Sequence, residues 1–132
     1  MAAVVLDSYA LLAYFRGEPE GAAVVELLDK ASHRDRPLHM SEVNYAEVKY
    51  MILRKDGERA WNDAAQLMSA LPIEFHDAGR ELADVAAGFK ARFKMSLADA
   101  FAAALTRQLK GELVTGDPEF KALTGEIKVQ FL

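Results

Sequence analysis

The sequence contains no cysteine and no long apolar run, and both absences exclude whole classes of protein. None of the 132 residues is cysteine, which excludes disulfides and thiolate metal sites and fits a reducing cytoplasm. No apolar stretch approaches the roughly 20 residues that a membrane-spanning helix needs. Residues 1–15 lack the basic leader of a signal peptide, and Asp7 interrupts their apolar stretch. We therefore expect a cytoplasmic protein that has no membrane segment.

An excess of positive charge is also missing. The chain has 16 Lys and Arg residues against 20 Asp and Glu residues, a formal net charge of −4. Such a balance argues against a protein that depends on non-specific phosphate attraction alone. The densest basic patch is formed by Lys90, Arg92 and Lys94, which a solvated helix face explains as well as a phosphate contact does. The candidates for phosphate contact are Arg16, Lys49, Arg80 and Arg92.

What the sequence does contain is a regular alternation of strand and helix patterns. Short apolar runs predict strands at residues 2–7, 38–41, 72–75, 112–115 and 127–131. Between them, helical periodicity predicts helices at residues 8–15, 20–31, 42–55, 58–71, 78–93 and 97–109, and a short helix at 118–123. Alternating strands and helices predict an α/β fold with a central, mainly parallel sheet that helices cover on both faces. We expect residues 1–132 to form one domain.

Four carboxylates occupy positions at which an acid is awkward for folding. Asp7 ends the first predicted strand, and Asp117 lies two residues after the predicted strand at 112–115. Glu47 lies on the helix that follows the second strand. Asp99 lies in the first turn of an Ala-rich helix. Because the carboxyl ends of parallel strands meet at one edge of a sheet, the fold brings these acids together. Their mutual repulsion then predicts either raised pKa values or a bound divalent cation.

Three of the four acids also have a simple structural explanation. Asp7 is a favourable N-cap for the helix that starts at Ser8. Ser96 and Asp99 have the spacing of a capping box, with Asp in place of Glu. Asp117 precedes Pro118, as an N-cap precedes a proline in the first helical turn. Helix capping and metal binding therefore both remain open for these three residues.

Glu47 has no comparable explanation. On a helix its face is shared by Val43, Tyr50 and Met51. An unpaired carboxylate on an apolar face is costly, so Glu47 requires a cation or a hydrogen-bonding partner. Asn44 can reach the same space and orient a carboxylate or a water. Glu42 lies well away around the helix, and we expect the helix dipole to satisfy it.

The order and surroundings of these acids resemble those of a PIN-domain ribonuclease of the VapC type, the toxin of bacterial and archaeal toxin–antitoxin pairs. The segments that carry the resemblance are VVLDSYALLA at residues 4–13, SEVNYAEV at 41–48, SLADAFAAA at 96–104 and LVTGDPEF at 113–120. The resemblance implies a catalytic and metal-binding core formed by Asp7, Glu47, Asp99 and Asp117. Thr115 would hold Asp7 or a water, and Asn44 and Ser8 would be polar neighbours. Glu119 stands where some members carry a further acid, and we rank it below the four.

The resemblance also implies a fold, an activity and partners. The expected fold is a PIN-like three-layer α/β/α sandwich, and the expected activity is hydrolysis of RNA phosphodiester bonds by a metal-dependent endoribonuclease. Carboxylate oxygens are hard ligands that suit Mg²⁺ or Mn²⁺, with Asp7 and Asp99 as our first choice of direct ligands. A cognate antitoxin of a type II toxin–antitoxin pair and a second copy in a homodimer are the implied protein partners.

Other classes of function fit the residues less well. A phosphotransferase with Asp7 as nucleophile would want a second acid at the position of Tyr9, and a receiver domain would want an acidic pair after the first strand. A non-catalytic PIN-like binding or regulatory domain remains the main alternative. The three histidines, His33, His39 and His76, form no metal-binding pair on one helix, and we interpret them as structural or surface residues.

Overall fold

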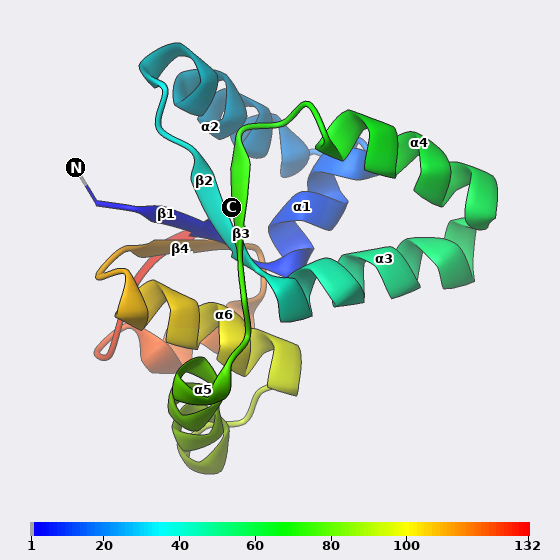
Figure 1. Cartoon of the computed structure of the whole chain (residues 1–132). Helices are drawn as coiled ribbons and strands as arrows, with labels where there is room; N and C mark the ends of the chain where they lie inside the picture. Colours follow the sequence, from blue (N-terminus) through cyan, green and yellow to red (C-terminus); the bar gives the residue numbers. More distant parts are fainter. Residues whose placement is uncertain (1) are drawn as a thin grey trace.

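A five-stranded sheet separates two layers of helices in the computed structural model, which describes residues 2–132 (Figure 1). The strands lie in the order β3-β2-β1-β4-β5, and all four pairings are parallel. Their bounds are β1 (Val4–Leu6), β2 (Leu38–Ser41), β3 (Ile73–His76), β4 (Glu112–Thr115) and β5 (Lys128–Phe131). The predicted α/β/α sandwich with a parallel sheet is confirmed.

The helices follow the predicted ranges, and only their ends differ. They are α1 (Ser8–Phe15), α2 (Gly21–Arg34), α3 (Glu42–Asp56), α4 (Glu58–Met68), α5 (Arg80–Arg92), α6 (Leu97–Gln108) and the 3-10 helix η1 (Pro118–Leu123). Gly57 separates α3 from α4 with a φ of 94°, a conformation that residues with a Cβ rarely adopt. A glycine at this position therefore lets α4 double back along α3.

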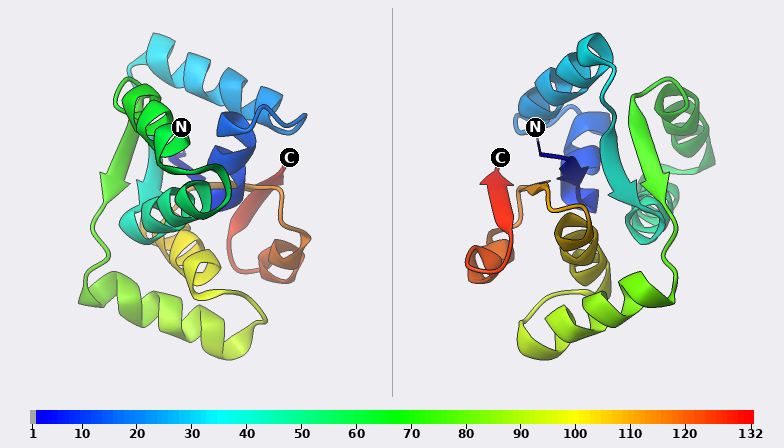
Figure 2. Two further views of the ribbon diagram at one scale, coloured as in Figure 1. Left: turned by 90° about the vertical axis from the view of Figure 1, so that its right-hand side faces the viewer. Right: turned by 60° about the vertical axis from the view of Figure 1, so that its left-hand side comes forward.

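Successive strand residues point to opposite faces of the sheet and so feed two separate cores. Val5 and Leu113 belong to the core under α5, α6 and η1. Leu6 and Val114 belong to the core under α1, α2, α3 and α4. Figure 2 shows the two helix layers on either side of the strands. With both faces covered, the central strand β1 can be fully apolar and β4 can have two apolar residues in succession, Leu113 and Val114.

The chain reverses its direction of travel across the sheet between β1 and β4. From β1 it builds outward through β2 to β3, and then α5 and α6 carry it back so that β4 can pair with the other side of β1. Ligands of open α/β sheets bind at such a switch point, beyond the carboxyl ends of the strands. Asp7 directly follows β1 and Asp117 lies two residues after β4, so both stand at this point.

One detail of the prediction for α3 is wrong. The side chains of Tyr50 and Glu47 do not share a buried apolar face, since Tyr50 is 51% exposed. The buried stripe of α3 runs instead through Asn44, Val48 and Ile52, at four-residue spacing. Glu47 borders that stripe and is partly buried. Its cost of burial is therefore lower than the sequence suggested.

Among residues 2–132, no helix is both long and apolar enough to cross a membrane. The longest helix, α3, carries charged residues along its length and buries only part of its surface against the sheet.

Candidate metal-binding and catalytic site

Asp7 is the most deeply buried acid of the site. Its side chain is 1% exposed, and its two oxygens have separate partners. Oδ1 accepts a hydrogen bond from the backbone N–H of Ala10 at 2.9 Å, which makes Asp7 the N-cap of α1. Oδ2 accepts from the Thr115 hydroxyl at 2.5 Å. Burial, together with the charges of Asp99 and Asp117, raises the pKa of Asp7 to about 7 despite these two bonds.

Thr115 connects the ends of the two central strands. Its hydroxyl donates to Asp7 after β1 and accepts from the backbone N–H of Asp117 at 3.0 Å. Asp117 in turn caps η1, since its Oδ1 accepts from the N–H of Glu119 at 2.9 Å. Thr115 is fully buried, so its single hydroxyl has no water to replace these partners. One threonine thus fixes both acids at the switch point.

Asp99 comes to the same place from α6. The predicted capping box is present: the Ser96 hydroxyl accepts from the N–H of Asp99, and the Asp99 carboxylate accepts from the N–H of Ser96. Partial burial raises the pKa of Asp99, and the negative charges of Asp117 and Glu47 add to this effect. Capping and clustering therefore coexist in the same residue.

Five acids make up what we call the acidic cluster: Asp7, Glu47, Asp99, Asp117 and Glu119. Ligand oxygens of Asp99, Asp117 and Glu119 lie within 4.8 Å of one another, a spacing at which one cation can contact all three. Glu47 and Asp7 belong to the same cluster because the charge of Glu47 helps to raise the pKa of Asp99, and the charge of Asp99 helps to raise the pKa of Asp7. The ion pairs found in the described residues involve none of the five acids. Glu42, by contrast, is an exposed acid in the first turn of α3.

Asn44 holds together three of the segments that carry these acids. Its fully buried amide donates from Nδ2 to the Ser8 hydroxyl at 3.0 Å and to the carbonyl of Ala98 at 3.1 Å. Its Oδ1 accepts from the Ser41 hydroxyl at 2.6 Å. Ser8 follows Asp7, and Ala98 precedes Asp99. Both polar atoms of the Asn44 amide are therefore hydrogen-bonded, and these bonds, which include the Ser8 hydroxyl, fix the three segments relative to one another.

Tyr9 covers the loop between β4 and η1. A Cβ added to Gly116 would lie 2.1 Å from Cε1 of Tyr9, so the ring is in direct contact with the glycine backbone. Burial raises the pKa of Tyr9, and neighbouring acids including Asp7 and Asp117 contribute. Tyr9 is nevertheless 38% exposed. It therefore forms an aromatic wall at the rim of the acidic cluster.

Several predicted phosphate-contact residues already have partners inside the protein. Arg92 pairs with Glu126 and lies over the rings of Phe89 and Phe93. Lys49 lies 5.3 Å from the ring centroid of Trp61. Arg16 caps the far end of α1, about 13 Å along the helix from Asp7 at about 1.5 Å per residue. Arg80, at the start of α5, is exposed.

Comparison with known proteins identifies the family. The family model described as the PIN domain matches residues 4–126. The chain belongs to the PIN-domain family. A search of curated protein sequences found no match. The family assignment agrees with the sequence resemblance described above.

Solved structures share the PIN fold of this chain at low sequence identity. A DNA-bound VapBC complex from Salmonella typhimurium superposes with a TM-score of 0.78 at 18% identity, over 98% of each chain. VapBC2 from Rickettsia felis, bound to a promoter DNA fragment, gives 0.76 at 14% identity over 97% of each chain. VapC20 from Mycobacterium tuberculosis, a toxin that cleaves the sarcin-ricin loop, gives 0.70 at 18% identity over 91% of this chain and 94% of that one.

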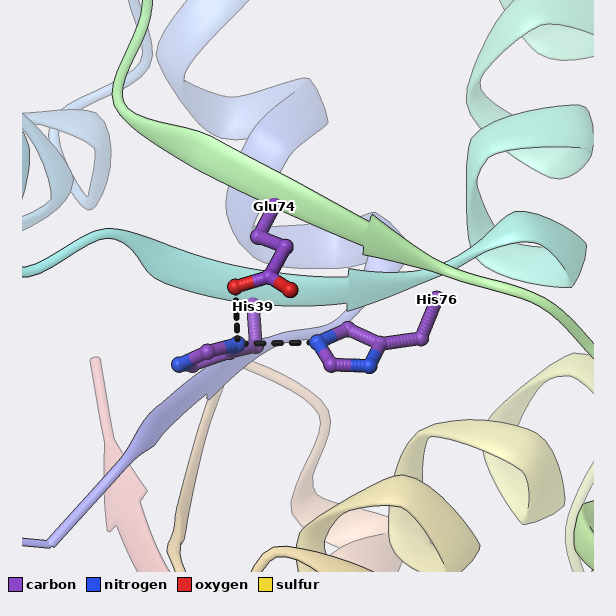
Figure 3. Close-up of side chains that lie close together, drawn as sticks. All are labelled: His39, Glu74 and His76. Atoms are coloured by element: carbon purple, nitrogen blue, oxygen red, sulfur yellow. Dashed lines mark hydrogen bonds and ion pairs between the residues drawn. The ribbon is translucent and has the colours of Figure 1, made fainter.

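Two features of the structure were missed or ranked low by sequence reasoning. Glu119 was placed below the four acids, yet its ligand oxygen lies with those of Asp99 and Asp117. A second group of ligand atoms, from His39, Glu74 and His76, also lies within 4.8 Å (Figure 3). The histidines lie on different strands, so a search for a pair on one helix could not find them. The strand pattern places His39 and His76 on one face of the sheet only once β2 and β3 are known to be neighbours, and the sequence does not show this.

Proposed function

We propose that this PIN-domain protein is a metal-dependent endoribonuclease that hydrolyses RNA phosphodiester bonds, and that it acts as the toxin of a type II toxin–antitoxin pair. The observation that carries the proposal is the buried Asp7, whose pKa is raised to about 7 and which faces Asp99 and Asp117 at the switch point of the sheet. Asp7 caps α1, but bringing its charge close to two further acids does not stabilise the fold. A site for cations that contact phosphate explains it.

The residues present fit Mg²⁺ or Mn²⁺. The donor atoms are carboxylate oxygens, which these hard cations prefer, and three of them lie within 4.8 Å of one another. The charges of Asp99 and Asp117 help to raise the pKa of Asp7, and those of Asp117 and Glu47 help to raise the pKa of Asp99. Neither Asp7 nor Asp99 takes part in an ion pair found among the described residues. A divalent ion held there would activate a water and offset charge on the phosphate. Asp7 and Asp99 are the direct ligands that we propose, and Asp117, Glu119 and Glu47 would contact the ion directly or through water.

The remaining polar residues of the site act as positioning residues. Thr115 holds the Asp7 carboxylate in one rotamer and fixes the loop that carries Asp117. Asn44 and Ser8 tie the start of α1 to the start of α6, which sets the separation between Asp7 and Asp99. Preorganised ligands matter because a misplacement of about 1 Å can cost on the order of a hundredfold in rate.

Exposed apolar side chains on α3 and α4 support the proposal of an antitoxin partner. Tyr50 is 51% exposed and Leu67 is 54% exposed. Next to Leu67 a pocket of about 420 Å³ is lined by Phe15, Arg16, Ile52, Asp56, Ala60, Asp63, Ala64 and Leu67. Nε of Arg16 lies 3.7 Å from Oδ2 of Asp56, an ion pair longer than a hydrogen bond, and within the described residues Nε and Nη2 are buried without a hydrogen-bond partner. We infer that a segment of the cognate antitoxin with apolar and acidic side chains fills this pocket. The apolar surface would also serve a homodimer.

A matched pair of substitutions on α3 tests the proposed activity. Glu47→Gln removes one charge from the acidic cluster, whereas Glu42→Gln removes one charge from the exposed start of the same helix. We expect Glu47→Gln to lower RNA cleavage in Mg²⁺ about a hundredfold or more, since metal contacts supply several kcal/mol of transition-state stabilisation. Cleavage by Glu42→Gln should stay near that of the wild type.

Two outcomes of the same assay would contradict the proposal. Equal activity of Glu47→Gln and the wild type would exclude Glu47 from the cleavage site. If folded wild-type protein binds Mg²⁺ or Mn²⁺ but cleaves no RNA from a total RNA pool, including ribosomal and transfer RNA, the non-catalytic PIN-like binding or regulatory domain becomes the better account.

A further inference from the structure

Strand register brings His39, Glu74 and His76 to one face of the sheet. In the parallel β2–β3 pair His39 lies opposite Glu74, and Ser41 lies opposite His76. Leu38 and Met40 point into the core under α1 to α4, so His39 between them points to the other face. Glu74 and His76 are two residues apart on β3 and share that face. Figure 3 shows the three side chains converging beside the two strands.

The distances within this group suit one metal ion. Nδ1 of His39 lies 2.9 Å from Nε2 of His76 and 3.8 Å from Oε2 of Glu74. Bonds of about 2.0–2.1 Å to a tetrahedral ion place ligand atoms roughly 3.3 Å apart. The two observed distances lie on either side of that value. Shifts of about half an ångström in side chains near an edge strand would therefore produce the coordination geometry.

The two facing nitrogens constrain what can lie between them. At 2.9 Å the His39 and His76 nitrogens share one proton, with one ring donating and the other accepting. Two N–H groups cannot face each other at this distance, so at least one lone pair is always directed into the gap. A cation that replaces the shared proton binds both lone pairs, and the Glu74 carboxylate adds a negative charge.

The donor set selects a class of metal different from that of the acidic cluster. Two borderline imidazole nitrogens and one hard carboxylate oxygen are the ligand set of open zinc sites that keep a fourth position for water. The group is open to solvent, because the Glu74 side chain is 57% exposed. It lies on β2 and the edge strand β3, whereas the acidic cluster surrounds the ends of β1 and β4.

We propose that His39, His76 and Glu74 form a second metal site, selective for Zn²⁺ or a similar divalent transition metal over Mg²⁺. A bound ion joins β2 to the edge strand β3 through side chains in addition to their backbone hydrogen bonds. Because the ligands come together only in the folded sheet, the ion stabilises the edge of the fold. The site is independent of whether the acidic cluster cleaves RNA.

Zinc binding can be measured without an activity assay. We would titrate Zn²⁺ into the full chain carrying Asp99→Asn, in excess Mg²⁺, by calorimetry, so that the acidic cluster does not compete. One Zn²⁺ per chain is expected. His76→Gln should weaken binding by at least about a hundredfold and Glu74→Gln by about tenfold, because each removes one of three protein ligands. His33→Gln is the matched control, since His33 is exposed on α2 and its Nδ1 hydrogen-bonds with the backbone carbonyl of Asp29.

Ring signals identify the ligands directly. In nitrogen-detected NMR of the histidine rings, Zn²⁺ should shift Nδ1 of His39 and Nε2 of His76 and leave His33 unchanged. Absence of zinc binding by the folded protein, or equal zinc affinity in the wild-type, His76→Gln and Glu74→Gln chains, would overturn the proposal. Glu74→Gln keeps the exposed position polar, so this variant preserves the test if His76→Gln does not fold.

Discussion

At the scale of single residues, Asp7 shows a conflict between burial and charge. Its pKa is 3.8 in an exposed setting and about 7 in the folded protein, because burial and the charges of Asp99 and Asp117 outweigh the bonds from Thr115 and Ala10. The folded state therefore binds the Asp7 proton more tightly than the unfolded state does. It follows that this residue makes the metal-free protein less stable as the pH rises from about 4 to about 7.

Replacing Asp7 with Asn removes this penalty. In EDTA at pH 8 we expect Asp7→Asn to raise the free energy of unfolding by about 2 kcal/mol. The full shift corresponds to about 4 kcal/mol, and the amide cannot reproduce both hydrogen bonds of the carboxylate. Asn remains a good N-cap for α1, so capping is kept. Chemical denaturation at pH 4, 6 and 8 measures the effect, which should vanish toward pH 4.

Asp63→Asn provides the control for that series. Asp63 is an exposed aspartate in α4, and its replacement should leave stability unchanged within about 0.5 kcal/mol at each pH. A loss of stability in Asp7→Asn at pH 8 would mean that capping and the Thr115 bond dominate. The electrostatic part of the account would then be wrong.

At the scale of elements, three of the five acids cap the start of a helix and also belong to the acidic cluster. Asp7 caps α1, Asp99 belongs to the capping box of α6, and Asp117 caps η1. Capping fixes where each helix begins, and each helix begins just after a strand or over the strand ends. The same hydrogen bonds therefore fix the helix starts and the positions of the three carboxylates, so the capping interpretation is confirmed and stays compatible with the proposed role in metal binding.

Among the residues that connect separate elements, Asn44 is the one whose replacement should lower the free energy of unfolding most. Asn44→Ala leaves the Ser8 and Ser41 hydroxyls and the Ala98 carbonyl without their amide partner in a buried place. We expect a loss of about 2–4 kcal/mol in unfolding free energy, from unsatisfied polar groups and a small cavity. Asn62→Ala on the exposed face of α4 is the matched control and should be neutral. Similar unfolding midpoints for the two variants would contradict this role.

The strands and helices were readable from the sequence because their signals are local. The apolar runs of β1 and β4, Gly57 between α3 and α4, and the caps at Ser41 and Ser96 all lie within a few residues of the boundaries they set. The convergence of the acids followed from one general rule about parallel strands. The role of each acid in the site stays a prediction.

What the sequence could not show depends on contacts between distant segments. Asn44 bonds to Ala98 across 54 positions, and His39 meets His76 across 37. These contacts require knowledge of which strands are neighbours and in which register. Helix phase was also imprecise at α3, where Tyr50 turned outward because Asn44 and Val48 set the buried stripe. A polar residue in a buried stripe is easily taken for a surface position.

At the scale of the whole molecule, the chain has a net charge of −4, and the acidic cluster gathers at one edge of the sheet. Phosphate cannot approach that edge unless cations neutralise it. Metal binding requires deprotonated carboxylates, and the pKa values of Asp7 and Asp99 are both raised. Binding of Mg²⁺ should therefore couple to proton release, and its strength should depend on pH near neutrality.

Calorimetry at pH 6, 7 and 8 checks this coupling. We expect the Mg²⁺ affinity to fall as the pH drops below about 7, by up to roughly tenfold per pH unit, because Asp7 must lose its proton. The variant Asp7→Asn has no such proton and should show a weaker, flatter dependence. An affinity that is independent of pH in the wild type would show that Asp7 is not coupled to the ion.

Cleavage of a mixed RNA pool by purified wild type and Asp99→Asn, in Mg²⁺, in Mn²⁺ and in EDTA, is the decisive measurement for the proposed metal-dependent nuclease. The account predicts cutting by the wild type in either metal, none in EDTA, and none by Asp99→Asn in any condition. Asp99→Asn retains the Ser96 cap on its own N–H, so its fold should persist. Cutting that continues in EDTA, or in folded Asp99→Asn at the wild-type rate, would contradict a metal-dependent nuclease centred on the acidic cluster.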